Sequence, residues 1–158
     1  MNGPGGDGPA RIVVGVDGSD GSKAALRWAA RQAGLTGAAL EAVITWEYPT
    51  FYGWAPAYPD DLDLARLAER TLADALDEVF GSDRPAWLRT RVLEGHPGQV
   101  LIEASAGAEL LVVGSRGYGG FADALLGSVS TYCLHHGRGP ITIIRPAVSG
   151  PRTKDPTR

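Results

Sequence analysis

Short apolar segments alternate along the chain with segments of helical periodicity, and this alternation restricts the possible folds more than any other feature. The apolar segments are residues 11–16, 40–46, 87–93, 110–113 and 141–144. The helical patterns cover residues 19–37, 60–80 and 128–136, with a further short helix that starts at Pro97. Continuous apolar strands that alternate with helices are typical of parallel sheets covered on both faces. The sequence therefore predicts a single doubly wound α/β domain with a five-stranded parallel sheet.

The composition excludes several classes of protein. The 158 residues carry 15 Lys and Arg against 18 Asp and Glu, so binding to nucleic acid by bulk charge is disfavoured. Cys133 is the single cysteine, which leaves no disulfide partner and no cysteine cluster for zinc. No apolar run approaches the ~20 residues of a membrane-spanning helix, and residues 1–10 lack the features of a signal peptide. We therefore expect a soluble, cytoplasmic protein without a membrane or nucleic-acid partner.

The two ends of the chain differ in composition from its middle. Residues 1–10 contain four Gly and two Pro, and residues 147–158 contain Gly, Pro and charged residues with little apolar content. Neither segment can bury an apolar face, so both are expected to lack stable structure. The sequence predicts a disordered leader at 1–10, a folded domain at 11–146 and a flexible tail at 147–158.

Glycine is over-represented, with 22 residues in 158, about twice the usual ~7%. Five of these glycines lie in residues 114–127, directly after the fourth predicted strand. The ligand sites of such sheets lie beyond the carboxyl ends of the strands, where the strand order reverses. Glycine lets a backbone approach a ligand closely, and the helix that follows attracts anions at its N-terminus. The segment therefore favours phosphate binding, and the alternative is that its glycines serve only a tight turn.

Three polar residues support the phosphate interpretation. Ser128 and Ser130, at the start of the helix, can add hydroxyl donors, and Arg116 can add a positive charge. One arginine cannot balance a triphosphate, so Mg²⁺ is an expected companion of the ligand.

The spacing Gly114-x2-Gly117-x9-Gly127-Ser128 matches the G-2x-G-9x-G-[S/T] signature, and the chain resembles the universal stress protein family. The resemblance extends over about residues 10–146 and includes Asp17-Gly-Ser after the first strand, Thr45-Trp46 at the end of the second, and Glu94-Gly-His-Pro after the third. It implies a nucleotide-binding domain with strand order 3-2-1-4-5. Because the glycine motif is intact, the chain is similar to the branch of the family that binds ATP.

Carried over by position, the resemblance implies a set of nucleotide contacts. Asp17 and Val16 are implied to meet the nucleoside end of ATP, and Trp46 to lie beside adenine. The residues implied at the phosphates are Gly114, Arg116, Gly117, Gly127, Ser128 and Val129. The resemblance also implies a homodimer formed through the last strand, residues 141–145.

The same residues have simpler interpretations. Asp17 could only cap the following helix, Trp46 could only pack in the core, and Arg116 could be a solvated loop residue. Because His135 and His136 are adjacent in a predicted helix, their side chains point in different directions, and no metal site is expected. Cys133 falls on the apolar face of that helix and is expected to be a buried small hydrophobe.

Aromatic residues gather in the predicted loop 47–59 and at its start. They are Trp46, Tyr48, Phe51, Tyr52, Trp54 and Tyr58. Such residues can stack on nucleic-acid bases, but no basic residue lies among them. A partly ordered lid or a dimer contact is the preferred interpretation.

Three functions are compatible with the sequence. The favoured one is an ATP-binding regulatory or stress-response protein that is at most a slow ATPase, because no general base for attacking water stands near the glycine motif. The first alternative is an enzyme similar to ATP pyrophosphatases, since Asp17-Gly-Ser-Asp-Gly-Ser resembles their Ser-Gly-Gly-x-Asp-Ser loop, although the order differs. The second alternative is a ligand-free interaction module.

Overall fold

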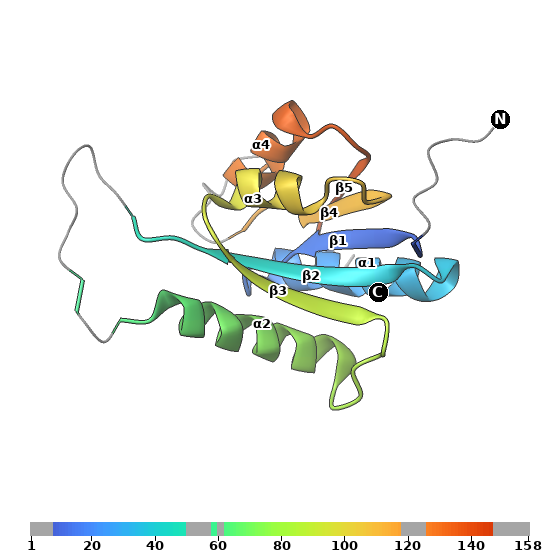
Figure 1. Ribbon diagram of the computed structural model, residues 1–158, viewed down its shortest axis with the longest axis horizontal. Coiled ribbons are helices and arrows are strands. Elements are labelled where there is room, and N and C mark those ends of the chain that lie inside the picture. Colours follow the sequence, from blue (N-terminus) through green and yellow to red (C-terminus); the bar gives the residue numbers. More distant parts are fainter. Residues whose placement is uncertain (1–7, 50–57, 60–61, 118–125, 147–158) are drawn as a thin grey trace, which may run out of the picture.

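The computed structural model describes residues 8–49, 58–59, 62–117 and 126–146, and these form alternating strands and helices (Figure 1). The elements in chain order are β1 (Arg11–Gly15), α1 (Asp20–Thr36), β2 (Ala39–Trp46), α2 (Leu64–Phe80), β3 (Leu88–Glu94), α3 (Pro97–Ala104), β4 (Leu110–Gly114), α4 (Ser128–His136) and β5 (Ile141–Ile144). Each predicted strand and helix is present, so the doubly wound α/β fold is confirmed.

The strands form one parallel sheet with the order β3-β2-β1-β4-β5. The chain builds outward from β1 to β3 and then returns to the other side of β1, where β4 pairs with it. The order implied by the resemblance is therefore confirmed. The reversal lies between β1 and β4, so the loops that leave these two strands diverge at the carboxyl edge of the sheet.

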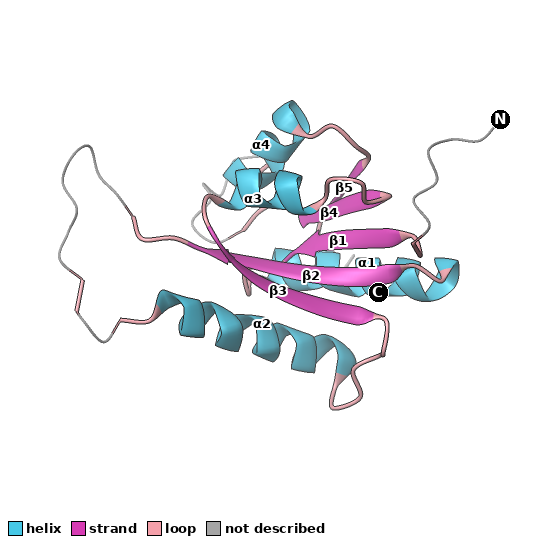
Figure 2. Cartoon of the chain, in the orientation of Figure 1, coloured by secondary structure: helices cyan, strands magenta, loops and turns pink. Residues whose placement is uncertain are grey.

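Helices cover both faces of the sheet (Figure 2), and each strand contributes alternate side chains to two cores. Ile12 and Val14 of β1 pack with α1 and α2, whereas Val13 packs with α3 and α4. Val13 and Val14 are both fully buried, and each apolar side chain of this size stabilises the fold by about 1.5–3 kcal/mol. Burial on both faces explains why the strands are continuously apolar in sequence.

The face of β2 that points toward α3 begins with a buried charge. The Glu41 carboxylate lies 2.8 Å from the Arg91 guanidinium and 3.4 Å from that of Arg11. Arg11 also donates hydrogen bonds of 2.8 Å to the carbonyls of Ala104 and Ala106, which follow or end α3. These contacts fix the C-terminal end of α3 over the sheet and satisfy the buried carboxylate.

One predicted boundary is wrong. The helix expected over residues 60–80 begins at Leu64, because Asp63 has extended dihedral angles and its carboxylate accepts a hydrogen bond of 3.0 Å from the Arg66 N–H. Asp63 is thus the N-cap rather than an interior residue. Residues 60–61 lie outside the described part of the chain.

The predicted leader is described only from residue 8 onward, and the predicted tail is not described. Residues 1–7 and 147–158 lie outside the described residues, whereas the Ala10 carbonyl accepts a hydrogen bond of 2.8 Å from the Ala39 N–H. Within the described ranges, no helix has the length and apolar character needed to cross a membrane.

Candidate functional site

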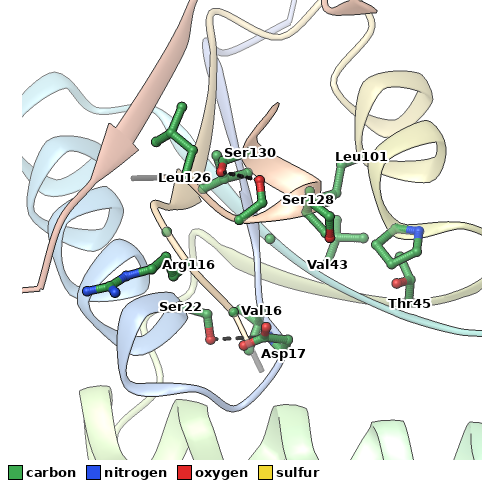
Figure 3. Close-up of a pocket in the computed structure, with 17 residues that line it drawn as sticks. Val16, Asp17, Ser22, Val43, Thr45, Leu101, Arg116, Leu126, Ser128 and Ser130 are labelled. Atoms are coloured by element: carbon green, nitrogen blue, oxygen red, sulfur yellow. Dashed lines mark hydrogen bonds between the residues drawn. The ribbon is translucent and has the colours of Figure 1, made fainter. Parts of the chain in front are cut away.

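A cavity of about 460 Å³ opens at the carboxyl ends of β1, β2 and β4 (Figure 3). Its lining comes from Gly15, Val16, Asp17, Ser22, Val43, Thr45, Pro97, Leu101, Val113, Gly114, Arg116, Gly117, Leu126, Gly127, Ser128, Val129 and Ser130. Cavities that bind small molecules have volumes of about 300–1,000 Å³ and mostly apolar walls with a few polar groups. The cavity lies at the strand-order reversal, where α/β sheets bind ligands.

Nine of the ten predicted site residues line this cavity. They are Val16, Asp17, Gly114, Arg116, Gly117, Gly127, Ser128, Val129 and Ser130. Residues 118–125, the middle of the glycine-rich loop, lie outside the described residues. The structure therefore brings together the loops that follow β1 and β4, as the sequence predicts.

Trp46 is the predicted residue that is absent from the described cavity lining. Its indole packs against the core between the sheet and α1 and α2, and it makes an edge contact with Tyr48, with ring centroids 5.7 Å apart. Thr45 lines the cavity instead. Successive side chains of a strand point to opposite faces of the sheet. Trp46 therefore points into the core, and Thr45, one residue earlier, points toward the cavity.

Eight further residues that line the cavity, most of them apolar, were not predicted from the sequence. The residues concerned are Gly15, Ser22, Val43, Thr45, Pro97, Leu101, Val113 and Leu126. The period of two along β2 groups Val43 and Thr45 on the face of Val13 rather than that of Val14, but it does not show which face lines the cavity. Leu101 reaches the cavity through packing of α3, which no local pattern in the sequence reports.

The turn from β1 to α1 is held by its own side chains. The Asp17 carboxylate accepts hydrogen bonds from the Ser19 N–H, at 2.8 Å, and from the Ser19 hydroxyl. Ser19 is the N-cap of α1, and its Oγ accepts a hydrogen bond of 3.2 Å from the Ser22 N–H. Gly18 has φ of 83°, which L side chains rarely adopt. Asp17 therefore does not cap the helix itself but supports the residue that does.

Asp17 also faces the glycine-rich loop. A Cβ atom added to Gly117 would collide with Asp17 Oδ2, so glycine at position 117 leaves room for this carboxylate. Oδ1 is the oxygen that Ser19 holds, which leaves Oδ2 directed toward the second loop. An acceptor is thus placed between the two loops that frame the cavity.

The two loops touch through their backbones, and this contact requires glycine. A Cβ atom on Gly21 would lie 2.5 Å from the Arg116 carbonyl oxygen, and one on Gly114 would lie 2.8 Å from the carbonyl group of Gly21. A Cβ atom on Gly127 would lie 3.2 Å from Arg116 Cα. In Figure 3 the Arg116 guanidinium extends away from the labelled Ser128 and Thr45. Part of the glycine excess therefore serves close packing of the loops.

The N-terminus of α4 opens into the cavity without a side-chain cap. Its N-cap is Gly127, with φ of −75° and ψ of 171°, whereas Ser19 and Asp63 cap α1 and α2. The first N–H groups of a helix lack partners within the helix, and the helix dipole makes them attractive to anions. Ser128 and Val129, the first two residues of the helix, line the cavity. This end of the cavity can hold a phosphate.

The hydroxyl of Ser130 has a different role from the one predicted from the sequence, which was to donate to a phosphate. Its hydroxyl is buried and lies 3.0 Å from the carbonyl oxygens of Ser115 and Gly127, to which it can donate. The hydroxyl therefore fixes the start of α4 against β4. The backbone N–H of Ser130 is the group that it can offer to an anion.

Cys133, the single cysteine of the chain, lies in the hydrophobic core. Burial raises the pKa of the Cys133 thiol to about 11, so the thiol is neutral at physiological pH. Sγ lies 4.0 Å from the Gly98 carbonyl, between α3 and α4. The expectation of a buried small hydrophobe is confirmed.

The histidines show no metal site in the described part of the chain. The rings of His135 and His136 are 6.5 Å apart, and the ring of His136 stacks on Tyr132 at 4.2 Å between centroids. No group of three His, Cys, Asp or Glu that could hold a metal ion occurs among these residues.

The aromatic segment after β2 is only partly described. The rings of Tyr48 and Tyr58 lie 5.1 Å apart, and the Tyr58 hydroxyl donates a hydrogen bond of 3.0 Å to the Pro49 carbonyl. The two described ends of the segment thus contact each other. Phe51, Tyr52 and Trp54, which the lid or dimer interpretation also invoked, lie outside the described residues.

Curated proteins that are similar to this chain are about twice as long as the segment that matches it. A universal stress protein of Mycolicibacterium smegmatis is 33% identical over 142 residues, which cover 84% of this chain and 47% of that protein. One of Mycobacterium tuberculosis is 34% identical over 144 residues, which cover 89% of this chain and 50% of that protein. The chain thus spans about half the length of the curated relatives it matches.

Universal stress proteins are also found among the solved structures that share this architecture. The universal stress protein UspA from Lactobacillus plantarum has a TM-score of 0.67 at 24% identity, covering 86% of this chain and 97% of that one. A universal stress protein in complex with cAMP has a TM-score of 0.59 at 26% identity, covering 88% and 98%. The model of the Universal stress protein family matches residues 9–145. The chain therefore belongs to the universal stress protein family.

Proposed function

We propose that this protein is an ATP-binding regulatory protein of the stress response, with the cavity between β1, β4 and α4 as its nucleotide site. The observation that carries the proposal is the uncapped N-terminus of α4 opening into a cavity of about 460 Å³. Backbone N–H groups and a helix dipole at that end suit the phosphates. Binding through the backbone also explains how a chain of net charge −3 can hold a polyanion.

The remaining lining suits a nucleoside. Val43, Leu101 and Val113 form apolar walls, and the Asp17 carboxylate provides an acceptor for a ribose or base donor. A structure 26% identical to this chain is that of a universal stress protein in complex with cAMP, which supports an adenine nucleotide as the ligand class. The intact glycine motif supports ATP within that class.

The residues present favour binding over catalysis. Asp17 is the single carboxylate among the described lining residues, and it lies against Gly117 with one oxygen held by Ser19. The described residues offer no carboxylate cluster, so Mg²⁺ would be held through phosphate oxygens and water. We expect at most slow hydrolysis of ATP.

Calorimetric titration of the full chain with ATP and Mg²⁺ tests the proposal. We expect saturable ATP binding by the wild type. Gly117→Ala and Asp17→Glu should each lower the affinity for ATP by at least about 10-fold, because both changes crowd the carboxylate at position 17 against residue 117. Gly139→Ala is the matched control, since a Cβ atom at position 139 has no neighbour within 4 Å. Equal binding by all four proteins would contradict the site, and no binding by the wild type would contradict the function.

The assembly proposed for this domain is a homodimer through β5. This strand pairs with β4 on one side, and no described element pairs with its other side. An exposed strand edge can pair with a second copy of the same chain. Light scattering of the full chain is expected to give twice the 16.6 kDa of one chain, and a monomer at all concentrations would contradict the dimer.

A further inference from the structure

Four hydroxyl side chains line the cavity among the described residues: Ser22, Thr45, Ser128 and Ser130. Two of them are occupied within the fold. The Ser22 hydroxyl donates a hydrogen bond of 3.1 Å to the Ser19 carbonyl and accepts one of 3.2 Å from the Asp17 N–H. The Ser130 hydroxyl is held by carbonyl groups at 3.0 Å. Neither is therefore a ready partner for a ligand.

The hydroxyls of Thr45 and Ser128 have no hydrogen-bond partner in the part of the chain that the structure describes. Ser128 is exposed, so water can satisfy it, whereas Thr45 is partly buried. A polar group that loses water without gaining a partner is costly. A ligand that closes the cavity over Thr45 must therefore supply a hydrogen bond or bear that cost.

The two hydroxyls belong to elements on different sides of β1. Thr45 lies at the carboxyl end of β2, whereas Ser128 begins α4, which follows β4. Because β1 lies between β2 and β4, the two sides are about two strand spacings, or ~10 Å, apart. Figure 3 shows Thr45 on the far side of Val43 from Arg116. A ligand with phosphates on α4 would thus extend its other end toward Thr45.

Apolar groups occupy the space between these two sides. Val43, Leu101 and Val113 are each less than 5% exposed and line the cavity. Such a surface suits the flat face of a nucleobase, whose polar edge must then find a partner beyond it. A threonine hydroxyl can donate and accept, so it can pair with either kind of group on that edge.

We propose that Thr45 is a specificity-determining residue whose hydroxyl hydrogen-bonds the edge of the nucleobase, so that the cavity recognises a nucleotide and not merely its phosphates. The inference rests on the proposed function. It assigns to Thr45 a side-chain contact with the base, whereas the resemblance implied that Trp46 lies beside adenine; the indole of Trp46 lies on the other face of the sheet.

The test compares two ligands, ATP and inorganic tripolyphosphate, each with Mg²⁺, on the full-length wild type, Thr45→Val and Thr45→Ser. Valine keeps the shape of threonine and replaces the hydroxyl with a methyl group. We expect Thr45→Val to bind ATP about 5- to 30-fold more weakly, the loss typical of one unsatisfied hydrogen bond, and to bind tripolyphosphate as the wild type does. The affinity of Thr45→Ser for ATP should lie within about 3-fold of that of the wild type, because serine keeps the hydroxyl.

Thermal unfolding without ligand checks that each variant is folded, and Thr45→Ala replaces Thr45→Val if valine lowers the Tm. Unchanged ATP binding by the hydroxyl-free variant would overturn the inference, and so would an equal loss of ATP and tripolyphosphate binding. Both outcomes leave the proposed function standing, since the wild type would still bind ATP. A wild type that binds no ATP would contradict the proposed function and the inference together.

Discussion

Gly21→Ala should both destabilise the protein and impair nucleotide binding, although Gly21 lies outside the glycine motif. The new Cβ atom would stand 2.5 Å from the Arg116 carbonyl oxygen, which belongs to the backbone and cannot rotate away. The β4 loop must therefore move away from α1. Overpacking of this kind costs about 1–3 kcal/mol, which exceeds the gain in helix propensity that alanine brings to the first turn of α1.

The same displacement should weaken ATP binding, because Arg116 lies between Gly21 and Gly127 and so sets the start of α4 relative to Asp17. We expect an ATP affinity at least about 10-fold lower, measured by calorimetry at a temperature where the variant is folded. The free energy of unfolding, measured by urea titration, should fall by about 1–2 kcal/mol.

Gly34→Ala is the matched control for this variant. Gly34 lies in the same helix, and a Cβ atom there has no neighbour within 4 Å. Its replacement should raise stability by about 0.5–1 kcal/mol through helix propensity and leave ATP affinity unchanged. A Gly21→Ala variant as stable as Gly34→Ala, with wild-type affinity, would show that the two loops do not depend on their backbone contact.

The features that could be predicted from the sequence are those that local patterns encode. The continuous apolar runs of β1 and β4 identify strands buried on both faces, and Gly127 followed by Ser128 marks the start of α4. A parallel α/β sheet then places the following loops at one edge. For these reasons most of the residues that line the cavity beside the β4 loop and α4 could be named from the sequence.

The features that could not be predicted depend on contacts between distant segments or on a register of one residue. The Thr45-Trp46 pair follows a run of side chains that are buried on either face, so its local pattern does not show which of the two faces the cavity. The contact of Gly21 with Arg116 joins residues 95 positions apart through the fold of the sheet. The start of α2 was misplaced because several acidic residues before it could each serve as the cap, and the structure uses Asp63.

Ser128→Pro should weaken ATP binding without weakening the fold. Ser128 is the first residue of α4, a position where proline is well tolerated because the N–H that it lacks has no partner within the helix. Gly127, which precedes it, has the extended dihedral angles that a residue before proline prefers. The substitution therefore removes one backbone N–H from the cavity and leaves the helix in place.

If the phosphates bind to the backbone of α4, the loss of one hydrogen bond to a charged group should reduce affinity by about 10- to 100-fold. Calorimetry with ATP and with tripolyphosphate should show the same reduction for both ligands, whereas Thr45→Val affects ATP alone. Ser128→Ala removes only the hydroxyl and should bind both ligands more tightly than Ser128→Pro does. Wild-type affinity in a folded Ser128→Pro protein would move the phosphates away from α4, and equal losses in the two Ser128 variants would assign the contact to the hydroxyl. The expected pattern would show instead that the N-terminus of α4 binds the phosphates and that β2, two strands away, recognises the base.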